Sequence, residues 1–510
     1  MQNWLPLFDF LAILADRIRN TSYRRKTEAL SCRPDDGTKE LIRRFFDQLE
    51  RFFHTSLRDT LARRIAVDGL PMTITDPLLT DNSFIENRTA VIHLLYTFNQ
   101  RCMTEESLLY CMKCQLPEVS GASPPFCSSL GIQSDGFRCL NTEHNAKQYN
   151  VWIIPRLDPF GFQESLAETG RSVDSHRLSH LDFKYFTIVY PEQLQLKSGI
   201  YYDIRNHFPY PLRSKSFSSL KIAAVPLTAT GIPPDFILTS EERKTSDGKQ
   251  VLFSINPCFA QEDKNPTLLM LKKKALKAIN AAECFGAHLI LFPEMMGTVD
   301  MIREIINQNT LLNTELMITP TIWQDHRNYA VALGSGGCPL FAQSKQNSFI
   351  LTKKETSGYI NLVEDLRDIN RTIHLYHVPG IGSIAIAICA DLITPEYRTL
   401  LTDILHVSFI LCPSYSPYFS DFSDAADMIR SNGAFALIVN CCGALDTNSS
   451  EFTDSLGIIT TPWVQSSKRT VKEYLIPRCR RECLNPEKTC LFEITIHKNG
   501  RLIIDHRILS

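Results

Sequence analysis

The sequence predicts an α/β fold for the region from residue 219 to residue 510, the last of the chain. An apolar, β-branched run from Ile384 to Ile388 is typical of a strand that is buried on both faces. A second apolar run, Leu289 to Phe292, follows a helical pattern that stops at Gly286. Buried strands next to helical segments fit the centre of an α/β sheet better than an exposed edge.

Residues 1–115 have a mostly helical pattern, in which apolar residues such as Leu11, Leu14 and Ile18 recur at helical spacing. Basic residues lie between them. Such charges usually form the solvated face of amphipathic helices, and a nucleic-acid surface is the less favoured interpretation. Residues 116–215 combine a cysteine-containing linker with α+β material, and a Ser- and Pro-rich stretch at 209–219 predicts a domain boundary.

Four cysteines in this N-terminal part are candidates for a structural zinc site. Cys111 and Cys114 form a Cys-x-x-Cys pair, and Cys127 and Cys139 follow beyond a Ser/Pro-rich linker. Four thiolates can complete a tetrahedral zinc site. The second half has no paired knuckle, however, so reduced thiols without a metal are the favoured interpretation and zinc is the alternative.

Charge and hydropathy limit the possible partners and the compartment. The formal net charge of −1 argues against a dominant nucleic-acid or membrane surface. No apolar run reaches the roughly 18 residues that span a bilayer. The apolar N-terminus carries Asp9 and Asp16 and predicts an amphipathic helix rather than a signal peptide. Together with 16 cysteines, these features predict a cytoplasmic protein without a membrane partner.

Two reactive side chains follow directly after the predicted buried strands. Cys389 ends the first run, and Pro293-Glu294 ends the second. Ligands of α/β sheets usually bind at the carboxyl ends of strands. A lone cysteine is more often a buried core thiol. If the two strands belong to one sheet, however, Cys389 and Glu294 converge, and a carboxylate beside a thiol can act as its base.

These motifs resemble the nitrilase, or carbon–nitrogen hydrolase, superfamily. The resemblance covers most of residues 219–510, with Pro226 where the family often has glutamine and Ser431 where it has glutamate. It implies a four-layer α-β-β-α sandwich, preceded here by the mostly helical and then α+β N-terminal region, and homo-oligomers formed through the sandwich. The matching segments, in family order, are 221–227, 289–294, 387–396, 411–414 and 432–443.

The resemblance also implies a mechanism. Glu294 would be the general base, Cys389 the nucleophile and a lysine the oxyanion stabiliser, with the backbone N–H of Ala390 as a second donor and Glu364 as a further site residue. A small-molecule amide- or nitrile-type substrate would form a thioester, which water hydrolyses or an amine intercepts. No cofactor and no metal is implied.

The lysine is the point at which the sequence departs from the family pattern. Lys354 is the favoured candidate, since Glu364 then falls where the family has a second glutamate, and Lys353 is its neighbour. A competing alignment starts the family's hairpin at Asn347. It places Val363 or Glu364 at the lysine position and leaves the site without a cation.

Two function classes therefore stand. The first is a cysteine-dependent hydrolase or acyl transferase acting on a non-peptide carbon–nitrogen bond. The second is a catalytically inactive nitrilase-like scaffold or binding module that supports the N-terminal region. The presence of both Glu294 and Cys389 favours the enzyme, and a missing lysine would favour the scaffold.

Overall fold

The computed structural model describes most of the chain beyond residue 186 and three short strands before it. The strands are β1 (Val119–Ser120), β2 (Arg138–Thr142) and β3 (Trp152–Pro155). The remaining described residues are 186–209, 217–228, 237–245, 248–255, 266–308, 311–355, 358–367, 369–416, 420–442, 455–462, 474–477, 485, 487–498 and 501–510.

The largest sheet contains the buried run that ends at the cysteine. In the described part of the chain it has nine strands in the order β1-β2-β5-β16-β17-β18-β19-β20-β21. Its centre is parallel from β17 through β18 to β19, so the carboxyl ends of these strands lie at one edge. Its further strands are β5 (Asp203–Phe208), β16 (Thr372–Val378), β17 (Gly382–Ile386), β18 (Phe409–Ser414), β19 (Phe435–Asn440), β20 (Ser455–Thr460) and β21 (Tyr474–Pro477).

A second sheet contains the run that ends at the glutamate. Its described strands follow the order β11-β12-β10-β9-β6-β22-β23, and β13 pairs with β12. β9 is parallel to both β6 and β10. The strands are β6 (Ser219–Ala224), β9 (Leu289–Leu291), β10 (Leu316–Ile318), β11 (Ile322–Gln324), β12 (Arg327–Gly334), β13 (Pro339–Ser344), β22 (Thr489–His497) and β23 (Leu502–Leu509).

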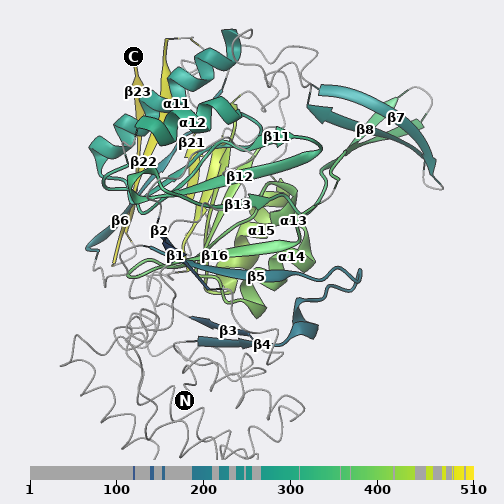
Figure 1. Cartoon of the computed structure of the whole chain (residues 1–510). Helices are drawn as coiled ribbons and strands as arrows, with labels where there is room; N and C mark the ends of the chain where they lie inside the picture. The colour runs from purple at the N-terminus through teal and green to yellow at the C-terminus, as the bar shows by residue number, and fades with distance from the viewer. Residues whose placement is uncertain are drawn as a thin grey trace, which may run out of the picture.

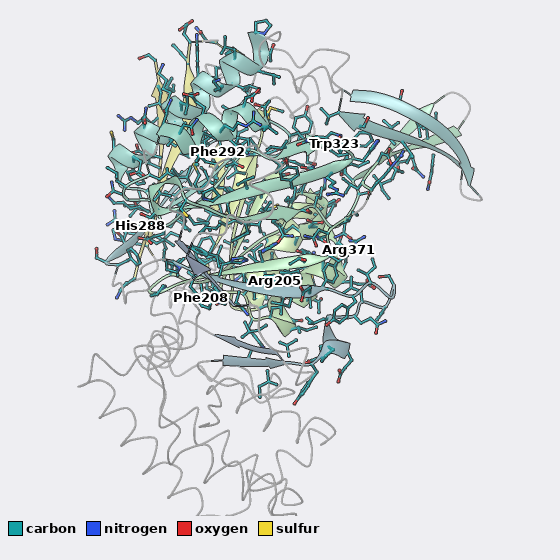
Figure 2. All side chains as sticks on the ribbon, viewed as in Figure 1. Arg205, Phe208, His288, Phe292, Trp323 and Arg371 are labelled. Carbon is teal, nitrogen blue, oxygen red and sulfur yellow. The ribbon has the colours of Figure 1, made fainter. Side chains whose placement is uncertain are left out.

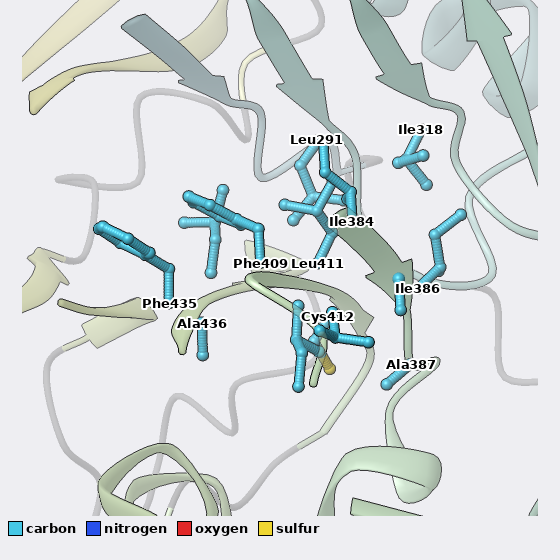
Figure 3. Close-up of a cluster of buried hydrophobic side chains, with 14 of the residues drawn as sticks. Leu291, Ile318, Ile384, Ile386, Ala387, Phe409, Leu411, Cys412, Phe435 and Ala436 are labelled. Atoms are coloured by element: carbon cyan, nitrogen blue, oxygen red, sulfur yellow. The ribbon is translucent and has the colours of Figure 1, made fainter. Parts of the chain in front are cut away.

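The two sheets pack face to face. Leu291 and Ile318 of the second sheet share one buried core with Ile384 and Ile386 of β17 (Figure 3). Side chains alternate along a strand, so Leu411 of β18 faces this inter-sheet core while its neighbour Cys412 points to the opposite face (Figure 3). Strand alternation therefore gives the central sheet two apolar faces.

Helices cover the outer face of each sheet (Figure 1). Phe292, which follows β9, packs in a core with residues of α11 and α12 (Figure 2). Residues of α13, α14 and α15 pack against the nine-stranded sheet. The layers thus run helix, sheet, sheet, helix. The helices are α11 (Pro266–Phe285), α12 (Val299–Gln308), α13 (Ala390–Ile393), α14 (Pro395–Thr399), a π-helical turn at Leu400–Ile404, and α15 (Ser420–Ser431).

A smaller sheet projects from one side of this sandwich (Figure 1). Its order is β14-β15-β8-β7. The strands are β7 (Ile237–Thr245), β8 (Gly248–Ile255), β14 (Ile350–Glu355) and β15 (Gly358–Glu364). The short strand β3 pairs with β4 (Phe186–Val189).

The mixed α/β class predicted for the C-terminal part is confirmed. The nine-stranded sheet also extends beyond the predicted domain start at residue 219, because β5 pairs in parallel with β16 and β2 pairs with β5. The predicted helices of residues 1–115 lie outside the described residues, as do Cys111, Cys114 and Cys127. Cys139 lies in β2. Among the described helices, none has the length and apolar character needed to cross a bilayer.

Candidate active site

Cys389 lies on a sharp turn between β17 and α13. The ladder to β18 continues past β17, because the Ala387 and Cys389 amides donate to the carbonyl oxygens of Leu411 and Pro413 at 3.0 and 2.9 Å. The chain then turns so tightly that Cys389 adopts φ 47° and ψ −104°, a conformation that residues with a Cβ rarely take. The turn directs a buried thiol, 1 % exposed, to the strand ends.

Glu294 reaches the same place from the second sheet. It follows β9 by three residues, and its amide donates to the Ser414 carbonyl oxygen at the end of β18 (3.3 Å). Its carboxylate is fully buried and accepts the Tyr415 amide at 3.0 Å, and it lies close enough to Cys389 for its charge to raise the pKa of the thiol. The two predicted strand ends therefore meet, although their strands belong to different, facing sheets.

The cation of the site is Lys345, the residue that follows β13. Its Nζ lies 2.7 Å from Oε1 of Glu294 and 2.6 Å from Oε2 of Glu364. The Asn328 side chain, on β12, donates to both carboxylates at 2.8 and 3.2 Å. The backbone carbonyl oxygen of Asn328 also accepts the backbone amide of Lys345 at 2.7 Å. All four side chains are buried, so the ion pairs are shielded from water.

Burial and neighbouring charges shift the proton affinities of this group. Burial raises the pKa of Glu294, and Lys345 acts in the opposite direction without cancelling that shift. Burial by itself would lower the pKa of Lys345, but the two carboxylates outweigh it and raise the pKa well above its usual value. Burial and the Glu294 charge also raise the pKa of the Cys389 thiol. The resting site therefore holds a neutral thiol beside a charged ammonium.

Two backbone amides complete the surroundings of the sulfur. The Tyr415 N–H donates to the Glu294 carboxylate at 3.0 Å and lowers the pKa of the neighbouring Cys389 thiol. The Ala390 N–H opens α13, where a helix has no intrahelical acceptor, and the described residues provide no acceptor for it. The Ser414 hydroxyl lies 3.7 Å from the sulfur.

Asn440, at the end of β19, holds the segment that carries the Tyr415 amide. Its Oδ1 accepts the Ser416 amide at 3.0 Å, and its Nδ2 donates to the Ser416 carbonyl oxygen at 2.7 Å. Because the Asn440 side chain binds both the N–H and the carbonyl oxygen of Ser416, it fixes the backbone next to Tyr415.

The structure brings together Glu294, Cys389, Ala390 and Glu364, as the sequence analysis anticipated, but it differs at the lysine. Lys354 lies within β14 of the projecting sheet, where it pairs with Tyr359, and Lys353 pairs with Ile360. The ammonium between the two carboxylates belongs to Lys345 instead.

Neither alignment of the sequence identifies Lys345 as the cation of the site. The competing alignment places Val363 or Glu364 at the lysine position and leaves the site without a cation. In the structure Glu364 lies in the site, and the positive charge comes from Lys345, which follows β13, the strand before the β14–β15 hairpin. Lys345 directly follows β13, but the polar residues Gln343 and Ser344 separate it from the apolar segment Pro339 to Ala342, so the strand-end rule that identifies Glu294 and Cys389 gives no clear signal here.

Within the part of the chain that the structure describes, no group of three or more histidine, cysteine or acidic side chains is arranged to hold a metal ion. Seven cysteines whose side chains the structure describes are free thiols, of which Cys284 is exposed; the other six are Cys338, Cys389, Cys412, Cys441, Cys442 and Cys490.

Comparison with known proteins gives distant likenesses. No family model matches the chain, and no curated protein is significantly similar to it in sequence. It is similar to the crystal structure of the C. elegans NitFhit protein (13% identity, 52% of this chain, 62% of that chain, TM-score 0.31). It is also similar to an N-terminal amidase with a Gln-Val peptide (12% identity, 41% of this chain, 54% of that chain, TM-score 0.20). The chain thus spans less than two thirds of either protein, and at these TM-scores the likeness assigns it neither family nor activity.

Proposed function

We propose that this chain is a cysteine-dependent hydrolase, or acyl transferase, that cleaves a non-peptide carbon–nitrogen bond through a thioester. One observation carries the proposal: Cys389 and the buried carboxylate Glu294 meet at the end of β18, where their amides donate to the carbonyl oxygens of Pro413 and Ser414, and this carboxylate is paired with the buried Lys345 at 2.7 Å. A core cysteine needs no such partners. A nucleophile needs a base in contact and a cation near the charge that develops.

Attack begins when the Cys389 sulfur approaches the carbonyl carbon of an amide. Glu294 takes the thiol proton as the carbon–sulfur bond forms. The raised pKa of Glu294 suits this task, because a base that accepts a proton must hold it long enough to pass it on. When the carbon–nitrogen bond breaks, the same proton goes to the departing amine, and an acyl thioester remains on Cys389.

The tetrahedral intermediate carries a negative oxygen that needs fixed donors. An ammonium group has three N–H donors. Glu294 and Glu364 take two of the Lys345 donors, so one is left for the oxyanion. The Ala390 N–H is the second donor, and loss of one such donor typically costs about 3 kcal/mol of transition-state stabilisation.

A second nucleophile then releases the acyl group. With Glu294 unprotonated again, water loses a proton to it and attacks the thioester carbon, and Cys389 leaves as a thiol. An amine in place of water gives acyl transfer by the same steps. The substrate class that fits is a small molecule with an amide- or nitrile-type group.

Covalent trapping tests the proposal. The full-length protein is incubated with a small amide- or nitrile-type electrophile, and peptide mass spectrometry locates any adduct. We expect an adduct on Cys389 that is lost in Cys389→Ala and strongly reduced in Glu294→Gln. The matched control, Cys284→Ala, removes an exposed thiol and should leave the Cys389 adduct unchanged.

The same experiment separates the two function classes. If Cys389 stays unmodified by every electrophile while Cys284 reacts, the enzyme proposal fails and the inactive scaffold is favoured. If Cys389 forms the adduct equally well in the wild type and in Glu294→Gln, Glu294 is not the base and the proposed mechanism fails.

A further inference from the structure

One buried carboxylate links the segment that carries the lysine to the turn that carries the cysteine. Asp391 is the second residue of α13 and is fully buried. Its Oδ2 accepts the amide of Ile388, directly before Cys389, at 3.1 Å. Its Oδ1 accepts the amides of Gln346 and Asn347, directly after Lys345, at 2.9 and 2.7 Å.

The Asn347 side chain adds a fourth donor to this carboxylate, at 3.0 Å. Burial raises the pKa of Asp391 to about 7, and the N–H groups of Asn347, Gln346 and Ile388 act in the opposite direction, because they favour the ionised carboxylate as their acceptor. The two oxygens divide their partners by segment: Oδ2 holds the cysteine turn and Oδ1 holds the lysine segment.

Other contacts hold the lysine segment without reaching the cysteine. Arg371 donates to the Gln346 carbonyl oxygen at 2.5 Å, and the Gln346 side chain donates to the carbonyl oxygens of Ser344 and Asn370 at 2.6 and 2.9 Å. These partners lie on β13 or beside β16. Asp391 thus connects the lysine segment to the cysteine turn, whereas the other hydrogen bonds of Gln346 connect that segment to β13 and to the residues before β16.

We infer that Asp391 is a positioning residue that fixes the Lys345 ammonium relative to the Cys389 sulfur. This inference rests on the proposed function for its purpose, since a stabilising cation is useful only if it stays within reach of the developing charge. Asp391 touches neither the thiol nor the ammonium in the hydrogen bonds described. It holds the backbone on either side of them. Its own charge also interacts with Lys345, but loss of that negative charge alone would lower the pKa of a nearby thiol, which is opposite in sign to the effect expected from a displaced ammonium.

The test is Asp391→Asn. An asparagine at this position turns one accepting group into a donor, so either the Ile388 amide or the amides of Gln346 and Asn347 would face an N–H instead of an oxygen. We expect the turn and the lysine segment to separate. Lys345 lowers the pKa of Cys389, so a displaced ammonium should raise the thiol pKa by about one unit, or tenfold less thiolate at neutral pH.

Two readouts that need no turnover measure this. The first is the pH profile of Cys389 alkylation by iodoacetamide, followed by mass spectrometry of the Cys389 peptide. Asp391→Asn and Lys345→Gln should each shift the profile, and the double variant should shift it no further than Lys345→Gln does, because both remove the same charge effect. The second is amide hydrogen exchange of the peptides that contain Ile388 and Gln346–Asn347, which should rise together in Asp391→Asn.

Two controls separate positioning from general loss of stability. Asp403→Asn removes the same charge at the π-helical turn, where the carboxylate accepts hydrogen bonds from Thr402 and Asn432. Ile429→Ala opens a cavity in the core beneath α15. Neither should shift the alkylation profile or the exchange of the two peptides relative to each other.

The inference is overturned if folded Asp391→Asn keeps the wild-type alkylation profile and exchange, or if its effect adds fully to that of Lys345→Gln. If Cys389 resists alkylation in every variant, the exchange measurement decides alone, and unchanged protection of both peptides overturns the inference. A third outcome separates the two proposals. If the amide- or nitrile-type electrophile forms no adduct on Cys389 but Asp391→Asn still changes alkylation or exchange, the proposed function is rejected and the positioning role of Asp391 stands.

Discussion

At the scale of single residues, the site combines a strained backbone with a set of buried charges. Cys389 takes a positive φ that favours glycine, and Lys345 is held by two carboxylates at 2.6 and 2.7 Å. Breaking a buried ion pair by removing one partner typically costs about 3–5 kcal/mol, because the remaining charge stays buried. An ordinary apolar core needs neither feature.

The backbone strain at Cys389 leads to the first prediction. Cys389→Gly relieves the unfavourable dihedral, whereas Cys389→Ala keeps it and loses only the sulfur. We expect the glycine variant to be more stable than the alanine variant by about 1 kcal/mol, although glycine usually destabilises ordered structure by a similar amount. Urea denaturation of both variants measures the difference, and a less stable glycine variant would show that the turn is unstrained.

The lysine gives the second prediction. Lys345→Met should abolish adduct formation on Cys389 and lower the unfolding free energy by about 3–5 kcal/mol, because Glu294 and Glu364 are left facing each other without a cation. Lys354→Met, in β14 of the projecting sheet, should change neither property. The measurements are the electrophile adduct and urea denaturation. An equal loss in both variants would reject the assignment of the cation to Lys345.

At this scale the sequence predicted two of the three central side chains. Cys389 and Glu294 were found because each ends a conspicuous apolar run. Lys345 was missed because the strand before it, Pro339–Ser344, is short and contains a proline and polar residues, so its end has no clear signal in the sequence. Asn328 was missed for a different reason: its role depends on which two carboxylates approach it in space.

At the scale of elements, β16 carries a buried polar network next to the strands of the site. His377 of β16 hydrogen-bonds to Ser383 of β17 and to Asn206 of β5, both at 2.8 Å, and its ring stacks on Phe208. One ring nitrogen serves each partner, which suits a neutral imidazole. Burial lowers the pKa of His377 from 6.5 to about 3.

This shift predicts acid sensitivity of the fold. The unfolded chain binds a proton at His377 near pH 6.5, but the folded protein does not until about pH 3. The contribution to stability is therefore fully present above pH 6.5 and is lost as the pH falls below it. Between pH 7.5 and pH 5.5 this one histidine should cost about 1 kcal/mol.

Urea denaturation at those two pH values checks the prediction with His377→Gln as the comparison. The variant should lose about 1 kcal/mol less than the wild type over the interval, although it is less stable at both pH values. Equal losses would mean that the histidine titrates normally in the folded protein.

The segment after β9 gives a packing prediction. A Cβ on Gly297 would lie 2.4 Å from the Pro320 carbonyl oxygen and 3.0 Å from that of Thr321. The backbone would have to move only three residues from Glu294. Gly297→Ala should therefore destabilise the protein by about 1–3 kcal/mol and lower Cys389 adduct formation.

Gly334→Ala is the matched control for that variant, because the atoms nearest to its Cβ would belong to the Leu340 side chain, at 3.2 Å, which can adjust more easily than backbone. Thermal unfolding of the two variants should separate them. A larger loss for Gly334→Ala would contradict the interpretation of the contact at Gly297.

At the scale of the whole molecule, the two sheets each deliver part of the site to the junction between them. The apolar core shared by Leu291, Ile318 and Ile384 fixes the distance between the sheets, and that distance sets whether Glu294 meets Cys389. The mixed α/β class could be predicted from buried runs next to helical patterns. The extent of the sheet could not, because the partner of β16 is β5, which lies before the predicted boundary at 215–219 and has a polar sequence, Asp-Ile-Arg-Asn-His-Phe.

This arrangement predicts where the chain can be cut. A fragment of residues 217–510 lacks β5 and leaves β16 with an open edge, so we expect it to aggregate or to unfold at lower temperature than a fragment of residues 186–510. Expression, gel filtration and thermal unfolding of both fragments measure this. Equal behaviour would support the predicted boundary at residue 219 as a true domain limit.

The placement of Lys345 on β13 has a wider consequence. What the proposed chemistry demands is a positive charge at one point in space, and any strand whose end reaches that point can supply it. A search for the same chemistry in other sequences would therefore have to compare where charges meet in the folded protein, because a fixed position in an alignment records only which strand carries the lysine.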